Sequence, residues 1–147
     1  MVSGDLGPAE TARRCAEAMW ANDHASKALG MTIEHVGPGE ATLAMVVRPD
    51  MVNGHDIAHG GLVSTLADSA FAFACNSHGV VTVAAGFEVD FLEAAHAGDH
   101  LVAHAREVAL RGRSGIYDVT VRRGDTVVAE FRGRSRSLGR PVLEEER

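Results

Sequence analysis

The stretch HGGLVSTLADSAFAFACNSHG, residues 59–79, decides the fold. From its first glycine to Ser77 it is rich in Ala and Leu and contains no Pro, and these roughly eighteen residues exceed the usual length of a strand. We therefore predict one long helix over 60–77. Its apolar residues cover most of the helix circumference and leave a narrow polar edge of Ser64, Thr65 and Asp68. Because a helix that is apolar nearly all round is buried nearly all round, this helix should be the centre of the core.

The rest of the chain predicts strands around that helix. An amphipathic helix from Pro8 to about Asn22 comes first, since apolar residues recur there at three- and four-residue spacing. Strands are expected at 31–36, 40–48, 80–92, 99–110, 115–123 and 126–137, with a loop over 49–58. Three or four long strands joined by short turns imply an antiparallel meander wrapped around the buried helix, which is an α+β architecture.

Length and composition indicate one globular domain over residues 1–147, of which 46% are hydrophobic and 23% charged. The ends, 1–7 and 140–147, are expected to be loose. A formal charge of −6 argues against a nucleic-acid binder. The longest weakly polar stretch, 57–77, is interrupted by polar side chains, so no membrane span is expected.

Only two cysteines, Cys15 and Cys75, are present, and no leader segment is recognisable at the start of the chain. We therefore expect free thiols and a reducing, cytoplasmic location. Cys75 lies within the apolar helix, where it should pack rather than react.

Positive charge is concentrated in the C-terminal third. From Arg106 to Arg140 there are nine Arg and four acidic residues, a local balance of +5, so the remainder carries −11. In the run FRGRSR, residues 131–136, strand alternation places Arg132, Arg134 and Arg136 on one face. This face is either a basic strip for a phosphorylated ligand or an ordinary solvated face of the sheet.

The stretch NGHDIAHGGLVSTLADSAFAFACNS, residues 53–77, is followed by VDFLEAAHAGD, SGIYDV and VVAEFRGRS. Together they strongly resemble the PaaI-type acyl-CoA thioesterases of the hotdog-fold superfamily, which act in phenylacetate degradation. The resemblance runs from about residue 12 to residue 139. It implies a curved antiparallel sheet wrapped around the central helix, and hydrolysis of phenylacetyl-CoA or a ring-hydroxylated relative. It also implies a homodimer with composite sites, paired again into a tetramer.

Hydrolysing a thioester requires a group that polarises the carbonyl and a base or nucleophile. Gly60 and Gly61 lie at the first turn of the predicted helix, where backbone N–H groups lack intrahelical partners. The Gly61 N–H is the candidate donor to the developing oxyanion, and Gly60 lets the ligand approach closely. Paired glycines can equally serve only a tight turn. Asp68 is either part of the polar edge or catalytic; by the resemblance it matches the family's carboxylate, acting as general base or nucleophile.

The spacing of Gly61 and Asp68 has a geometrical consequence. Seven residues place them on nearly the same helix face but about 10.5 Å apart along the axis. One thioester cannot easily touch both residues of one chain. If two subunits pack their helices side by side and antiparallel, each Asp68 lies near the other chain's Gly61 and a dimer holds two composite sites.

Two residues before the helix match the family's pattern. Asn53 is a candidate to orient the water or the carbonyl, although Asn before Gly is commonly a turn residue. His59 is expected to orient the loop and the substrate rather than to transfer a proton. The family often places a small hydroxyl near the carboxylate, whereas the matching positions here are Ala84, Ala85 and Gly86.

The basic region gains a role if the ligand is an acyl-CoA, whose diphosphate and ribose phosphate suit the forked donors of Arg. The candidates are Arg111, Arg113, Arg132 and Arg134. No metal site is predicted, because HDIAH at 55–59 replaces the Glu of the zinc motif and runs from a loop into two glycines. No cofactor is expected, since coenzyme A is part of the substrate. The alternatives are a noncatalytic acyl-CoA-binding hotdog protein and a hotdog hydratase or dehydratase.

Overall fold

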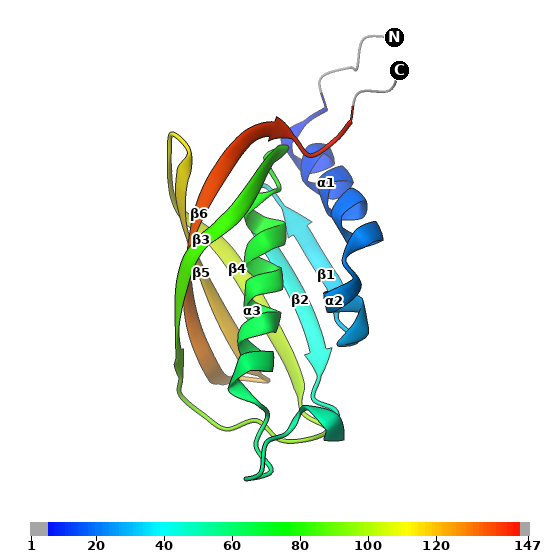
Figure 1. The fold of residues 1–147 in the computed structure, drawn as a ribbon, viewed down its shortest axis with the longest axis vertical. Coiled ribbons are helices and arrows are strands. Elements are labelled where there is room, and N and C mark those ends of the chain that lie inside the picture. Colours follow the sequence, from blue (N-terminus) through cyan, green and yellow to red (C-terminus); the bar gives the residue numbers. More distant parts are fainter. Residues whose placement is uncertain (1–5, 145–147) are drawn as a thin grey trace.

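A single long helix lies against one face of a six-stranded antiparallel sheet in the computed structural model, which describes residues 6–144 (Figure 1). This helix, α3 (Gly60–Cys75), has nine of its sixteen residues buried, which confirms the predicted central helix. It ends two residues before the predicted end because Asn76 caps it. The Asn76 side chain donates to the Ala72 carbonyl at 2.8 Å and also bonds the backbone of Thr82.

The sheet has the order β1-β2-β4-β5-β6-β3. Its strands are β1 (Thr32–Gly37), β2 (Glu40–Val46), β3 (Val80–Phe91), β4 (His100–Arg111), β5 (Ser114–Arg123) and β6 (Thr126–Pro141). The meander is confirmed for β4, β5 and β6. The expectation that β3 could be a fourth strand of this meander was wrong, because β3 pairs with β6 at the far edge of the sheet and not with β4. Residues 92–98 carry the chain across the end of the sheet instead of forming a tight hairpin, and β3 is left as an edge strand.

Helices α1 (Pro8–Asn22) and α2 (His24–Ala28) precede the sheet, and a short 3-10 helix, η1 (Pro49–Met51), lies in the predicted loop. The bounds of α1 are as predicted, and α1 packs against β1. Helix α2 was not predicted. The Asp23 side chain caps it by accepting from the Ser26 N–H, and the Ser26 hydroxyl meets that of Ser69 at 2.8 Å, which ties α2 to α3.

The C-terminal strand is longer than predicted. Strand β6 continues to Pro141, which pairs with Val80, so the loose end expected from residue 140 was wrong for its first two residues. Of the rest of the expected loose ends, residues 6–7 and 142–144 belong to no helix or strand, and residues 1–5 and 145–147 lie outside the described residues. Across the described part of the chain, no helix has both the length and the apolar character needed to cross a membrane.

Alternation along β6 separates a core face from an outer face. Phe131, Gly133 and Ser135 are buried, whereas Arg132, Arg134 and Arg136 are exposed, as predicted. Gly133 lies directly under the Phe71 ring of α3, because a Cβ added to the glycine would be 2.8 Å from Phe71 Cζ. The buried face of the sheet therefore faces α3, and the arginines project from its other side.

Candidate active site

One stripe of α3 remains open on the side away from the sheet. It contains exposed Gly61 and the half-buried residues Ser64, Thr65, Asp68 and Ala72. The two hydroxyls are already used, since Ser64 Oγ donates to the Gly60 carbonyl at 2.8 Å and Thr65 Oγ1 to the Gly61 carbonyl at 2.7 Å. Asp68 is the remaining polar side chain on the stripe, and it is half-buried.

Asp68 combines partial burial with a lack of partners. Within residues 6–144 its carboxylate makes no hydrogen bond and no ion pair, although the structure contains many of both. Burial raises the pKa of Asp68 above the ordinary aspartate value because desolvation disfavours the charged form. A half-buried, unpartnered carboxylate with a raised pKa is suited to accept a proton from water.

Cys75 lies at the end of the same helix and does not share this chemistry. Burial raises its pKa to about 12, and the charge of Asp68 adds to the shift. Burial therefore favours the protonated thiol, and Cys75 packs in the core as predicted. Both Cys15 and Cys75 are free and buried.

The first turn of α3 carries a cap that sequence reasoning missed. The Gly61 N–H donates to the ring Nδ1 of His59 at 3.1 Å, so the predicted oxyanion donor already has an acceptor. The next two N–H groups of the helix donate to the His59 carbonyl, whereas the Gly60 N–H has no acceptor among the described residues. A substrate oxygen can reach the Gly61 N–H only when the exposed His59 ring turns away.

Asn53 closes the loop before the helix. Its Oδ1 accepts from the N–H groups of His55 and Ile57, at 2.9 and 3.3 Å. The loop is attached to the domain by hydrogen bonds from the Ala58 N–H to the Ala95 carbonyl and from the His59 N–H to Met51. Asn53 is thus a turn residue in this structure, and the NH2 group of its side-chain amide has no acceptor within residues 6–144.

The structure keeps Gly61 and Asp68 apart. Both lie on the open stripe of one uninterrupted helix, and seven residues at 1.5 Å each separate them by about 10.5 Å along the axis. Beside them, edge strand β3 and the residue that follows it leave five large apolar side chains exposed. They are Val80, Val83, Phe87 and Phe91, with Leu92 directly after the strand. The same edge therefore offers unpaired backbone groups and an apolar surface.

The family often places a small hydroxyl near its carboxylate, but the hydroxyl on β3 in this chain is already used in a hydrogen bond. Thr82, the nearest hydroxyl on β3, donates to the Val80 carbonyl at 2.8 Å. Its backbone N–H and carbonyl are held by Asn76. Thr82 therefore fastens the start of β3 to the end of α3.

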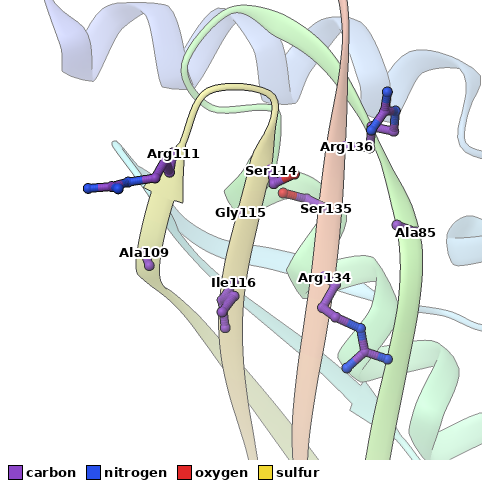
Figure 2. Close-up of a pocket in the computed structure, with 9 residues that line it drawn as sticks. All are labelled: Ala85, Ala109, Arg111, Ser114, Gly115, Ile116, Arg134, Ser135 and Arg136. Atoms are coloured by element: carbon purple, nitrogen blue, oxygen red, sulfur yellow. The ribbon is translucent and has the colours of Figure 1, made fainter.

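Only two of the four arginine candidates come together. Arg111 and Arg134 line a pocket of about 400 Å³ on the outer face of the sheet. Arg136, which was not among the predicted phosphate-binding residues, lines it too. Figure 2 shows the three side chains pointing in different directions, with Ile116 between Arg111 and Arg134. The pocket opens on the side of the sheet opposite α3.

The other two candidates lie elsewhere. Arg132 is bound by two hydrogen bonds, of 2.7 and 2.9 Å, to Asp118 on the neighbouring strand, which also lowers the pKa of that carboxyl. Arg113 is in the β4–β5 turn and is not part of the pocket lining. The register between strands, rather than the spacing along one strand, decides which arginines remain available to bind a ligand.

Comparison with known proteins agrees with this fold. Residues 55–130 match the model of the family described as the thioesterase superfamily. The chain is 42% identical over 131 residues to the acyl-coenzyme A thioesterase PaaI of Escherichia coli, covering 88% of this chain and 94% of that protein.

Solved structures give the same result. The structure of the E. coli PaaI protein from the phenylacetic acid degradation operon superposes with a TM-score of 0.90 at 40% identity, covering 92% of this chain and 99% of that one. A mutant structure of the phenylacetic acid degradation protein PaaI of Thermus thermophilus has a TM-score of 0.75 at 41% identity, covering 77% and 97%. The hotdog fold is confirmed, and the chain belongs to the thioesterase superfamily.

Proposed function

We propose that this protein is an acyl-CoA thioesterase that hydrolyses phenylacetyl-CoA or a ring-hydroxylated relative to the free acid and coenzyme A. The similarity to a protein named acyl-coenzyme A thioesterase, and to one from a phenylacetic acid degradation operon, supports the substrate class. The observation that carries the proposal is Asp68, a half-buried carboxylate on the open stripe of α3 with a raised pKa and no partner among residues 6–144.

In the proposed reaction, Asp68 acts as general base or as nucleophile. As a base, it removes a proton from water while the water oxygen bonds to the thioester carbon and the carbonyl oxygen becomes an oxyanion. The intermediate collapses by breaking the C–S bond, and the coenzyme A sulfur leaves as thiolate and takes up a proton. As a nucleophile, the carboxylate oxygen bonds to the thioester carbon and the C–S bond breaks, so that the coenzyme A thiolate leaves and takes up a proton; water then hydrolyses the resulting anhydride to the free acid and the Asp68 carboxylate. Neither route requires a cofactor.

The N-terminus of α3 is the proposed oxyanion site. The helix dipole favours negative charge there, and the N–H groups of Gly60 and Gly61 can both donate to the carbonyl oxygen. The Gly60 N–H needs no rearrangement, whereas the Gly61 N–H must first exchange its bond to His59 for one to the substrate. His59 thus serves as a replaceable cap for the Gly61 N–H. Asn53 is proposed to orient the water or the carbonyl through its side-chain NH2 group, which has no acceptor among the described residues.

We propose that each site is shared by two chains, because Gly61 and Asp68 are separated along one helix. Antiparallel packing of two α3 stripes would bring the Asp68 of one chain beside the Gly61 of the other. Strand β3 lies at the edge of the sheet, and its unpaired backbone groups offer a surface for such an assembly. Dimers are expected to pair into tetramers, as the family resemblance implies.

The phosphates of coenzyme A are proposed to bind at the outer pocket with Arg111 and Arg134, joined by Arg136. Arg136 has no acidic partner among the described residues, whereas Arg134 contacts Glu88 only at 3.5 Å. Arg132 is committed to Asp118, and we leave it and Arg113 out of this site. The two free thiols are compatible with the reducing cytoplasm that we propose as the location.

A substrate screen tests the proposal. Purified protein is incubated with aryl- and alkyl-acyl-CoAs, and release of the free coenzyme A thiol is followed with a thiol reagent. Release of thiol and free acid from phenylacetyl-CoA, faster than from straight-chain acyl-CoAs, is the expected result. Binding without release would indicate a noncatalytic acyl-CoA-binding protein. Hydration of an enoyl-CoA with no thiol released would indicate a hydratase.

A further inference from the structure

We propose that Phe91 forms the aromatic wall of the acyl subsite and determines the preference for aryl over small acyl groups. This inference rests on the proposed thioesterase function and adds a specificity-determining residue to it. Phe91 is the last residue of β3, directly beside the start of α3.

The Phe91 ring lies on the glycine that begins α3. A Cβ added to Gly60 would be 3.0 Å from Phe91 Cζ and 3.3 Å from Cε2, so the ring packs closely against this glycine. Register places Phe91 opposite buried Ala129, on the face of the sheet that faces α3. The tip of the Phe91 ring therefore lies close to Gly60, whose N–H has no acceptor among the described residues.

Phe91 is not needed to fill the core. Its exposed fraction is 51%, and it is absent from the buried cluster around α3. Phe87, four residues earlier on the same face, is held by stacking on Phe131 with ring centroids 4.7 Å apart. No such aromatic stacking holds Phe91 in the described part of the chain. A large apolar side chain that packs on a glycine and remains half exposed is available to a ligand.

The position of the carbonyl oxygen decides which part of the substrate Phe91 would touch. A thioester oxygen bound by the first-turn N–H groups has its acyl α-carbon only two bonds away, so the acyl group must lie within a few ångströms of Gly60. Phe91 is the large apolar side chain that contacts this glycine, whereas His55 and Asp56 in the preceding loop are polar and exposed. An apolar acyl group is favoured on the Phe91 side, and an aryl ring can stack there, whereas an acetyl group is too small to cover the ring.

The test compares Phe91→Ala and Phe91→Leu with the control Leu92→Ala. Leu92 is the adjacent residue, 57% exposed, and its N–H donates to the Val128 carbonyl, so the control removes a similar apolar side chain from the same surface. The quantity measured is the ratio of kcat/KM for phenylacetyl-CoA to kcat/KM for acetyl-CoA. We expect this ratio to fall about tenfold or more in Phe91→Ala, and less in Phe91→Leu, which keeps apolar volume without the ring. In Leu92→Ala it should change less than about twofold.

A ratio in Phe91→Ala that matches the control would overturn the inference. Loss of assembly or of stability lowers both activities together and leaves the ratio unchanged, so it cannot imitate the expected result. If Phe91→Ala does not fold, Phe91→Leu decides the question by the same ratio. Failure of the proposed function is recognised separately, because the unmodified protein would then release no coenzyme A from either substrate.

Discussion

Mixed dimers of two separately inactive chains test the separation of Gly61 and Asp68 along α3. The first variant is Gly61→Val. A Cβ at this position would lie 3.2 Å from the Nδ1 of His59, so the valine displaces the capping ring and its methyl groups cover the N–H. Loss of the cap costs about 1 kcal/mol, which a domain of this size tolerates. The second variant, Asp68→Asn, removes the carboxylate charge at nearly constant volume.

The expected magnitude follows from the geometry. Since about 10.5 Å of helix separates the two residues, each site takes its donor from one chain and its carboxylate from the other. In a mixed dimer, one site combines both defects, and the other combines an intact Gly61 with an intact Asp68. Purified mixed dimers should therefore recover up to about half of the wild-type activity. An unfractionated equal mixture, in which about half of the dimers are mixed, should recover about a quarter.

The assay uses co-expressed chains with two different affinity tags, purified over both matrices, with thiol release from phenylacetyl-CoA as readout. A control pairs the wild-type chain with the chain that carries both substitutions. Composite sites leave that control inactive, whereas sites contained in one chain leave it half active. Correctly assembled mixed dimers without activity, together with a half-active control, would refute the reasoning.

The remaining predictions concern pH, charge and packing. Because burial raises the pKa of Asp68, the folded state binds its proton more tightly than the unfolded chain, so this residue lowers stability as pH rises from about 3.9 through the raised value. Asp68→Asn should thus have a higher Tm than wild type at neutral pH, and the difference should vanish in acid, as thermal unfolding across pH will show. Arg134→Gln should raise KM for phenylacetyl-CoA at low salt and less at high salt, while Arg122→Gln, the same charge change away from the pocket, should not. Gly133→Ala should lower the free energy of unfolding by about 1–3 kcal/mol in urea titrations, because its Cβ would lie 2.8 Å from Phe71 Cζ.

The central helix and the open stripe could be predicted because they depend on local periodicity. Apolar residues around nearly the whole circumference of residues 60–75 require a buried helix, and helical geometry alone places Gly61 and Asp68 on one face. The alternation of buried and exposed side chains over Phe131–Arg136 could be predicted for the same reason, because the two-residue period of a strand does not depend on which strand it pairs with.

Contacts between distant segments could not be predicted in the same way. The pairing of β3 with β6 and the bond between Arg132 and Asp118 depend on register across the sheet, which one sequence does not reveal. The contact of Phe91 with Gly60 is of the same kind. The His59 cap had a local signal, because His59 directly precedes the first helical residue, but cap preferences favour Ser, Thr, Asp and Asn.

The most direct test of the account is the rate of coenzyme A release from phenylacetyl-CoA by the Asp68→Asn protein and by wild type, measured together with substrate binding. Binding by the folded variant, checked by calorimetry, separates loss of chemistry from loss of the site. The account predicts that turnover falls by at least about a hundredfold while phenylacetyl-CoA still binds. Near-wild-type turnover in the folded Asp68→Asn protein would contradict it.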